Sequence, residues 1–177
     1  MSLLATRSLL SAPKQAHSRN VRAFTLVEIG LAALIIGLMA VLAIPQFKKS
    51  ILVTRSETTI NDLRVFSQAF QAYLHDKGDW PPETEAGGIP SGMEGYLRES
   101  NWTHASPIGG CYNWDKNQLH GGKHLRAAIA ISSKGENRVT TDMAQLLDID
   151  LRYDDGNLST GSFRLGAANE PVFVIEP

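Results

Sequence analysis

The chain has 177 residues, of which 43% are hydrophobic and 20% are charged, and its formal net charge is −1. This length suits one domain plus an extension, and the composition is that of a folded protein rather than a disordered or collagen-like one. The first 23 residues hold four cations and no acid, which leaves 13 basic and 18 acidic residues, a net charge of about −5, in the remainder. The scattered cations of this acidic remainder argue against nucleic acid as a partner, because such binding needs a basic stripe.

Residues 1–23 are predicted to be a basic leader. The four cations are Arg7, Lys14, Arg19 and Arg22. A cluster of this kind directly before an apolar segment predicts that the N-terminal side of that segment faces the cytoplasm. The bulk of the chain would then lie on the other side of the membrane.

Residues 24–47 form the most apolar segment of the chain. Its only polar side chains are Thr25, Glu28 and Gln46. As a helix these residues would extend over about 36 Å, and a bilayer core needs about 20 residues. A cleaved secretory signal would have a shorter apolar region followed by a small-x-small site, which does not occur here. A helix of a soluble core fits the preceding basic leader poorly, so a transmembrane helix is the best interpretation.

Two features refine this helix. Small residues recur at intervals of three and four, which places them on one narrow face that allows close approach of another helix in lipid. Pro45 has no amide hydrogen and crowds the carbonyl of Val41, so a kink or a short unwound stretch is expected there. The small residues are Gly30, Ala33, Gly37 and Ala40.

The motif Phe24-Thr-Leu-Val-Glu28, followed by about twenty apolar residues and Ala43-Ile-Pro-Gln-Phe47, resembles the type IV pilin and type II secretion pseudopilin superfamily. The resemblance implies that a prepilin peptidase cuts between Ala23 and Phe24 and methylates the new N-terminus of Phe24. Glu28 and Pro45 then become the fifth and twenty-second residues, as in the family pattern. Ala23 departs from that pattern, because the family usually has glycine before the cut.

Glu28 is predicted to act in assembly. A cut before Phe24 creates an α-amino group that is mostly charged at neutral pH, because its reference pKa is about 7.7–8.0. The resemblance implies that this amine pairs with Glu28 of a neighbouring subunit. Without the resemblance, an equally good interpretation is that Glu28 lies at the headgroup level and reaches toward water.

Residues 48–77 are predicted to continue the helix, and residues 78–177 to form a globular head. The apolar residues between 60 and 74 recur in steps of three and four, as on an amphipathic helix. Gly78 and Pro81-Pro82 predict its end. The expected fold class is α+β: a long N-terminal helix packed on a small antiparallel sheet. The apolar stripe comprises Ile60, Leu63, Phe66, Phe70, Tyr73 and Leu74.

Within the head, a short helix is predicted near 93–99 and another through about Leu147, capped by Thr141 with Asp142 in its first turn. Turn residues and alternating patterns predict four strands. These are Gly110–Trp114, Leu125–Ser132, Ser162–Leu165 and Val172–Ile175. The lone Cys111 excludes an intrachain disulfide, so the head must be held by packing.

The candidate chemical sites in the head are weak. His120 and His124 flank Gly121-Gly122, which predicts a solvated hairpin turn rather than a metal site. The acidic residues Asp148, Asp150, Asp154 and Asp155 are dense in oxygen ligands, and calcium prefers six to eight oxygens. Major pseudopilins carry calcium in a late loop, but the spacing here does not align with that site or with an EF-hand. A helix end and a turn in solvent is the simpler interpretation, and no cofactor is expected.

The sequence therefore predicts a structural protein, not an enzyme. It would be stored in the cytoplasmic (inner) membrane with its N-terminus inside and its head outside, and then assembled into a periplasmic or cell-surface filament. Its expected partners are copies of itself or related pilins, prepilin peptidase, an inner-membrane assembly platform and, before assembly, the lipid bilayer. The alternatives are a pseudopilin of a type II secretion system and a minor or non-polymerising membrane-anchored subunit.

Overall fold

The structure is a computed structural model that describes residues 24–120 and 122–177. The chain divides into two compact units, one ending at Leu42 and one formed by Ala43–Pro177. The predicted leader, residues 1–23, lies outside the described residues. Each unit is considered by itself below.

Helix α1, Leu26–Lys77, runs through both units and remains helical through Pro45. The expected unwound stretch is therefore not observed. In the second unit, the predicted apolar stripe of α1 lies against the core, and Leu63, Phe66 and Phe70 are at most 1% exposed. Ser56 and Thr59 share this buried face, because their hydroxyls donate to the helix's own carbonyls at Leu52 and Arg55, 3.1 and 2.9 Å away.

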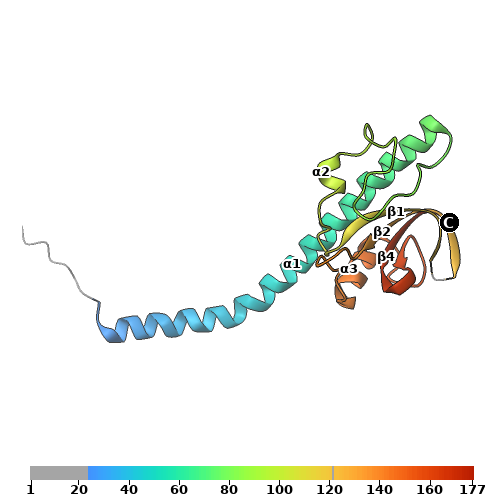
Figure 1. The fold of residues 1–177 in the computed structure, drawn as a ribbon. Helices are drawn as coiled ribbons and strands as arrows, with labels where there is room; N and C mark the ends of the chain where they lie inside the picture. The colour runs from blue at the N-terminus through green and yellow to red at the C-terminus, as the bar shows by residue number, and fades with distance from the viewer. Residues whose placement is uncertain (1–23, 121) are drawn as a thin grey trace, which may run out of the picture. The chain divides into compact units, whose positions relative to one another are not determined.

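The head contains a four-stranded sheet in the order β1-β2-β4-β3, in which every neighbouring pair is antiparallel. Figure 1 labels β1, β2 and β4 of this sheet. Its strands are β1 (Cys111–His120), β2 (Lys123–Ser132), β3 (Phe163–Leu165) and β4 (Pro171–Glu176). A β-bulge interrupts the β2–β4 register between Ala127 and Ala128. The expected α+β fold, a long helix packed on a small antiparallel sheet, is confirmed.

An aromatic cluster joins α1 to one face of the sheet. Phe70 stacks on Trp114 of β1 with ring centroids 3.9 Å apart, and Phe66 meets Tyr112 edge to face at 4.8 Å. The indole N–H of Trp114 donates to the Pro81 carbonyl at 3.0 Å, so its polar atom is satisfied inside the core. This packing holds the head, since its single cysteine is free.

The structure corrects the predicted bounds of two elements. Strand β1 continues six residues past Trp114, where polar residues are tolerated because β1 lies at the edge of the sheet. The helix predicted near 93–99 is displaced to α2, Glu99–Trp102. Met93 instead begins a single turn, closed by hydrogen bonds from the Tyr96 and Leu97 amides to its carbonyl.

Helix α3, Met143–Tyr153, extends six residues beyond the predicted end at Leu147. Its N-cap is Asp142 rather than Thr141, because the Asp142 carboxylate accepts a hydrogen bond from the Ala144 amide at 3.0 Å. A short 3-10 helix, η1 (Ala167–Asn169), lies between β3 and β4. The longer α3 places Asp148 and Asp150 on a helix, where a turn was expected.

Candidate functional site

The first described residues, 24–42, are exposed throughout. Within α1 an 18-residue window reaches a mean hydropathy of 2.6, and none of it is buried. The helix is therefore long and apolar enough to cross a membrane. Within the described chain, its apolar side chains have no covering surface.

Thr25 and Glu28 form a capping box at the start of α1. The backbone amide and the hydroxyl of Thr25 both donate to Glu28 Oε2, at 2.8 and 3.0 Å, and the Glu28 amide donates to Thr25 Oγ1 at 3.2 Å. These bonds satisfy amides that would otherwise be unpaired at the helix N-terminus, and a carboxylate there is favoured by the helix dipole. Glu28 thus has a local structural role in addition to its predicted assembly role.

The capping role of Thr25 was missed from the sequence, although the signal was present. Thr-x-x-Glu immediately before an apolar run is the pattern of a capping box. The resemblance to pilins drew attention to Glu28 alone. The capping box also explains why a carboxylate can begin an apolar helix without any partner from another chain.

The four predicted small residues lie on the exposed part of α1. A Cβ built on Gly30 or Gly37 would meet nothing within 4 Å, so no contact inside the described chain requires glycine at either position. Their small size therefore leaves space for something outside the chain. Ala23 lies outside the described residues, and the cleavage site stays a prediction.

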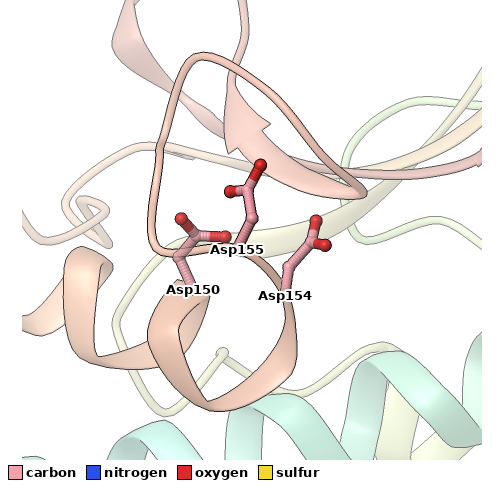
Figure 2. Close-up of side chains that lie close together, drawn as sticks. All are labelled: Asp150, Asp154 and Asp155. Atoms are coloured by element: carbon pink, nitrogen blue, oxygen red, sulfur yellow. The ribbon is translucent and has the colours of Figure 1, made fainter.

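A second group of polar residues lies at the C-terminal end of α3. The structure brings together three of the four predicted aspartates, and carboxylate oxygens of Asp150, Asp154 and Asp155 lie within 4.8 Å of one another (Figure 2). Asp148 has a different partner, because its carboxylate accepts from Arg152 Nε at 2.9 Å. Asp150 is fully buried, which corrects the expectation of a solvent-exposed turn.

Burial and the two neighbouring carboxylates raise the pKa of Asp150. The pKa of Asp155 is instead lowered, because its carboxylate accepts hydrogen bonds from the Thr160 hydroxyl and the Asn157 amide. Asp155 therefore stays ionised, whereas the neighbouring buried carboxyl group of Asp150 resists ionisation. All the potential ligands in this group are carboxylate oxygens, which hard divalent cations prefer.

The predicted hairpin between β1 and β2 is present and His124 is exposed, but His120 departs from the prediction. His120 is not solvated: its Nε2 lies 2.9 Å from Asp115 Oδ2, and the two side chains are 11% and 6% exposed. Asn113 Nδ2 donates to Asp115 Oδ1 at 2.6 Å. Burial raises the pKa of Asp115 to about 6, although the neighbouring His120 acts to lower it. The positive φ of Asn117 interrupts the simple alternation along β1, so sequence spacing did not predict this pair.

Comparisons with known proteins agree with the architecture. No family model matches the chain. The fimbrial protein EcpC of Eikenella corrodens is 30% identical over 74 residues, which are 42% of this chain and 48% of that protein. The structure of the major type IV pilin PilA1 of Clostridium difficile matches with a TM-score of 0.50 at 20% identity, covering 72% of this chain and 98% of the pilin chain.

These similarities bear on the fold and on the resemblance found in the sequence. The long helix on an antiparallel four-stranded sheet is a pilin fold. The superfamily expected from Phe24-Thr-Leu-Val-Glu28, the type IV pilin-like proteins, is the one to which both similarities point. The chain matches about half the length of its fimbrial relative. One of these similar proteins is named a fimbrial protein and the other a major type IV pilin.

Proposed function

We propose that this chain is a structural subunit that polymerises through the first half of α1 into a type IV pilus-like filament. The observation that carries this proposal is the exposed apolar surface of residues 24–42, which nothing in the described chain covers. Lipid would cover this surface before assembly, and the same segments of neighbouring subunits would cover it afterwards. The similarity to a fimbrial protein and to a major type IV pilin favours a pilus over a secretion pseudopilus.

In this proposal, prepilin peptidase cuts between Ala23 and Phe24 on the cytoplasmic side of the inner membrane and methylates Phe24. The head lies outside that membrane until the assembly platform adds the subunit to a filament. Apolar burial alone gives little driving force for this step, because lipid is as apolar as the neighbouring helices. Close packing at Gly30 and Gly37 and a polar contact at Glu28 are therefore needed.

Glu28 can make that polar contact without giving up its cap. Both hydrogen bonds from Thr25 go to Oε2. Among residues 24–120 and 122–177, no hydrogen bond to Oε1 is found, so this oxygen can accept from the Phe24 amine of a neighbouring subunit. Such pairing would offset the cost of a charge in lipid, which is about 2.5–3.5 kcal/mol at the centre of a membrane helix.

Two substitutions separate the capping role of Glu28 from its pairing role. Glu28→Gln keeps a capping-box residue but removes the charge. Thr25→Ala keeps the charge but removes the cap, at a cost of about 1 kcal/mol in helix stability. We expect Glu28→Gln to be inserted in the membrane normally and to be lost from filaments, and Thr25→Ala to assemble with a modest reduction. Immunoblots of membrane and surface-shear fractions measure both effects.

The reverse pattern would contradict the pairing role. If Glu28→Gln forms filaments at the wild-type level while Thr25→Ala does not, Glu28 acts through the helix cap alone. If cells release no filament containing the wild-type chain but secrete a folded protein that depends on it, the subunit belongs to a type II secretion pseudopilus. A chain found only in the membrane fraction would be a minor or non-polymerising anchored protein.

A further inference from the structure

We propose that the C-terminal end of α3 and the loop at residues 154–162 form a binding site for a calcium-class divalent cation, with Asp150, Asp154 and Asp155 as ligands. Figure 2 shows the three side chains where α3 passes into this loop. The proposal concerns the head alone and does not depend on filament assembly.

The spacing of the three carboxylates suits one cation. Their oxygens lie within 4.8 Å of one another. Two oxygens bound to the same calcium ion at 2.3–2.6 Å can lie at most about 5.2 Å apart, whereas magnesium, at 2.0–2.1 Å, requires separations below about 4.2 Å. The three side chains therefore need only small movements to bind one calcium ion. Carboxylate oxygens are also the ligands that hard divalent cations prefer.

Asp150 provides a second, independent observation that points to a ligand at this site. Its side chain is 0% exposed, and neither carboxylate oxygen has a hydrogen-bond partner among the described residues. A buried polar group without a partner is costly, and a buried charge more so. Because Asp150 Oδ atoms lie with those of Asp154 and Asp155, the unsatisfied carboxylate faces the proposed site.

The loop holds the other two ligands in place. Asp155 accepts from the Asn157 amide at 2.9 Å and the Thr160 hydroxyl at 2.7 Å. Asp154 accepts from the amides of Ser162 and Phe163 through Oδ2, which leaves Oδ1 available. Gly161 has a φ of +75°, and a Cβ there would collide with the Asp154 carboxylate, so glycine allows the loop to close around it.

The local charge favours a cation over a proton. The C-terminal end of a helix carries partial negative charge, which adds to the three carboxylates at the end of α3. Arg152, the basic residue of the last turn, is directed elsewhere, with Nε 2.9 Å from Asp148 and Nη1 3.4 Å from Glu57. A proton on Asp150 would neutralise one carboxylate only, whereas a divalent cation would bind all three.

The proposed cation would connect the last turn of α3 to the sheet. Asp154 is the C-cap of α3 and also bonds to the Phe163 amide at the start of β3. A cation shared by Asp150 and Asp154 would therefore join the last turn of α3 to the strand that follows the loop. In a head without disulfides, such a link would resist local opening of this loop.

Calcium binding to the full-length chain in detergent, after treatment with a chelator, tests the site. Isothermal titration with CaCl2 should show one site per chain, and thermal unfolding should shift to higher temperature in CaCl2 than in chelator at matched ionic strength. The absence of both calcium binding and a thermal shift would overturn the proposal. Tighter binding of Mg2+ than of Ca2+ would overturn the assignment to calcium.

Two variants assign the ligands. Asp150→Asn should weaken calcium binding at least about tenfold, and without calcium it should unfold at or above the wild-type temperature, because it removes a buried charge. This combination separates loss of a ligand from loss of folding. Asp148→Asn is the matched control on the same helix and should bind calcium as the wild type does. Wild-type affinity in Asp150→Asn, or equal loss in Asp148→Asn, would overturn the assignment.

Discussion

The two halves of α1 make opposite use of apolar side chains. In the first half, Leu34 is 61% exposed and nothing in the described chain covers it, whereas in the second half Phe70 is 0% exposed and stacks on Trp114. One half therefore contributes to the stability of the head and the other does not. The apolar side chains of the second half are buried in the head, so the fold explains why they are apolar. Those of the first half are exposed, so the reason for their apolar character must lie in a function.

The largest expected effect comes from substituting matched residues in the two halves. Phe70→Ala should lower the free energy of unfolding by about 3–5 kcal/mol, since it removes a large buried ring and leaves a cavity. Leu34→Ala should change it by less than about 0.5 kcal/mol. Urea unfolding of the full chain in detergent, followed by tryptophan fluorescence, measures both. Similar losses in the two variants would show that the first half also packs on the head.

A substitution in the first half of α1 should change filament yield without changing the stability of the head. Gly37→Leu adds a side chain where nothing within 4 Å obstructs it inside the described chain. The stability of the head should therefore be unchanged, while the amount of filament falls severalfold because neighbouring helices can no longer approach closely. Quantitative electron microscopy of shear fractions measures the yield, and Leu38→Ile, at a neighbouring exposed position, provides the control. Unchanged filament yield in Gly37→Leu would remove the small-residue face from the proposed interface.

A smaller effect is expected at the start of α3. Asp142→Ala removes the observed N-cap and should lower the free energy of unfolding by about 1 kcal/mol. Thr141→Ala, at the position that sequence alone favours for the cap, should change it by less than about 0.5 kcal/mol. Urea unfolding of the two variants decides between the two residues, and a larger loss in Thr141→Ala would contradict the observed cap.

The smallest effect is a change in pH dependence at the sheet edge. Because the pKa of Asp115 rises from 3.8 to about 6 on folding, the folded state holds a proton that the unfolded state releases. The stability from this carboxyl is fully present below the unfolded pKa and is lost as pH rises through the folded pKa. Asp115→Asn should therefore flatten the fall in stability over this window, as measured by thermal unfolding across pH.

Asp76→Asn gives a control of opposite sign. Hydrogen bonds from Tyr96 and His75 lower the pKa of Asp76, so its stabilising contribution is present above the unfolded pKa and is lost as pH falls. Removing it should reduce stability at neutral pH and leave the contribution of Asp115 intact. If Asp115→Asn has the pH profile of the wild type, Asp115 does not titrate as described.

Sequence reasoning predicted the main architecture because strong periodic signals produce it. The stripe from Ile60 to Phe70 and the alternating residues of β2 follow patterns that few other structures satisfy. The end of α3 could not be predicted in the same way. Aspartate is a weak helix former, so Asp148 and Asp150 suggested a helix end, and tertiary packing overrode that local preference.

Long-range contacts account for most of what was missed at the candidate sites. The burial of Asp150 depends on how α3 packs, and the contact between Asp115 and His120 depends on how the β1–β2 hairpin packs. Residue spacing in the sequence does not predict either kind of packing. The cap formed by Thr25 is different, because Thr-x-x-Glu was visible in the sequence. Local hydrogen bonds were therefore predictable in principle, whereas buried polar clusters required the fold.

The central claim is that the first half of α1 holds copies of this chain together in a filament. Electron microscopy of surface-shear fractions, combined with mass spectrometry of the N-terminus of this chain in those fractions, tests it most directly. We predict filaments that contain the chain with N-methylated Phe24 as its first residue. Shear fractions without the chain would contradict the claim, and filaments containing the chain with an intact Met1 terminus would overturn the predicted cleavage before Phe24.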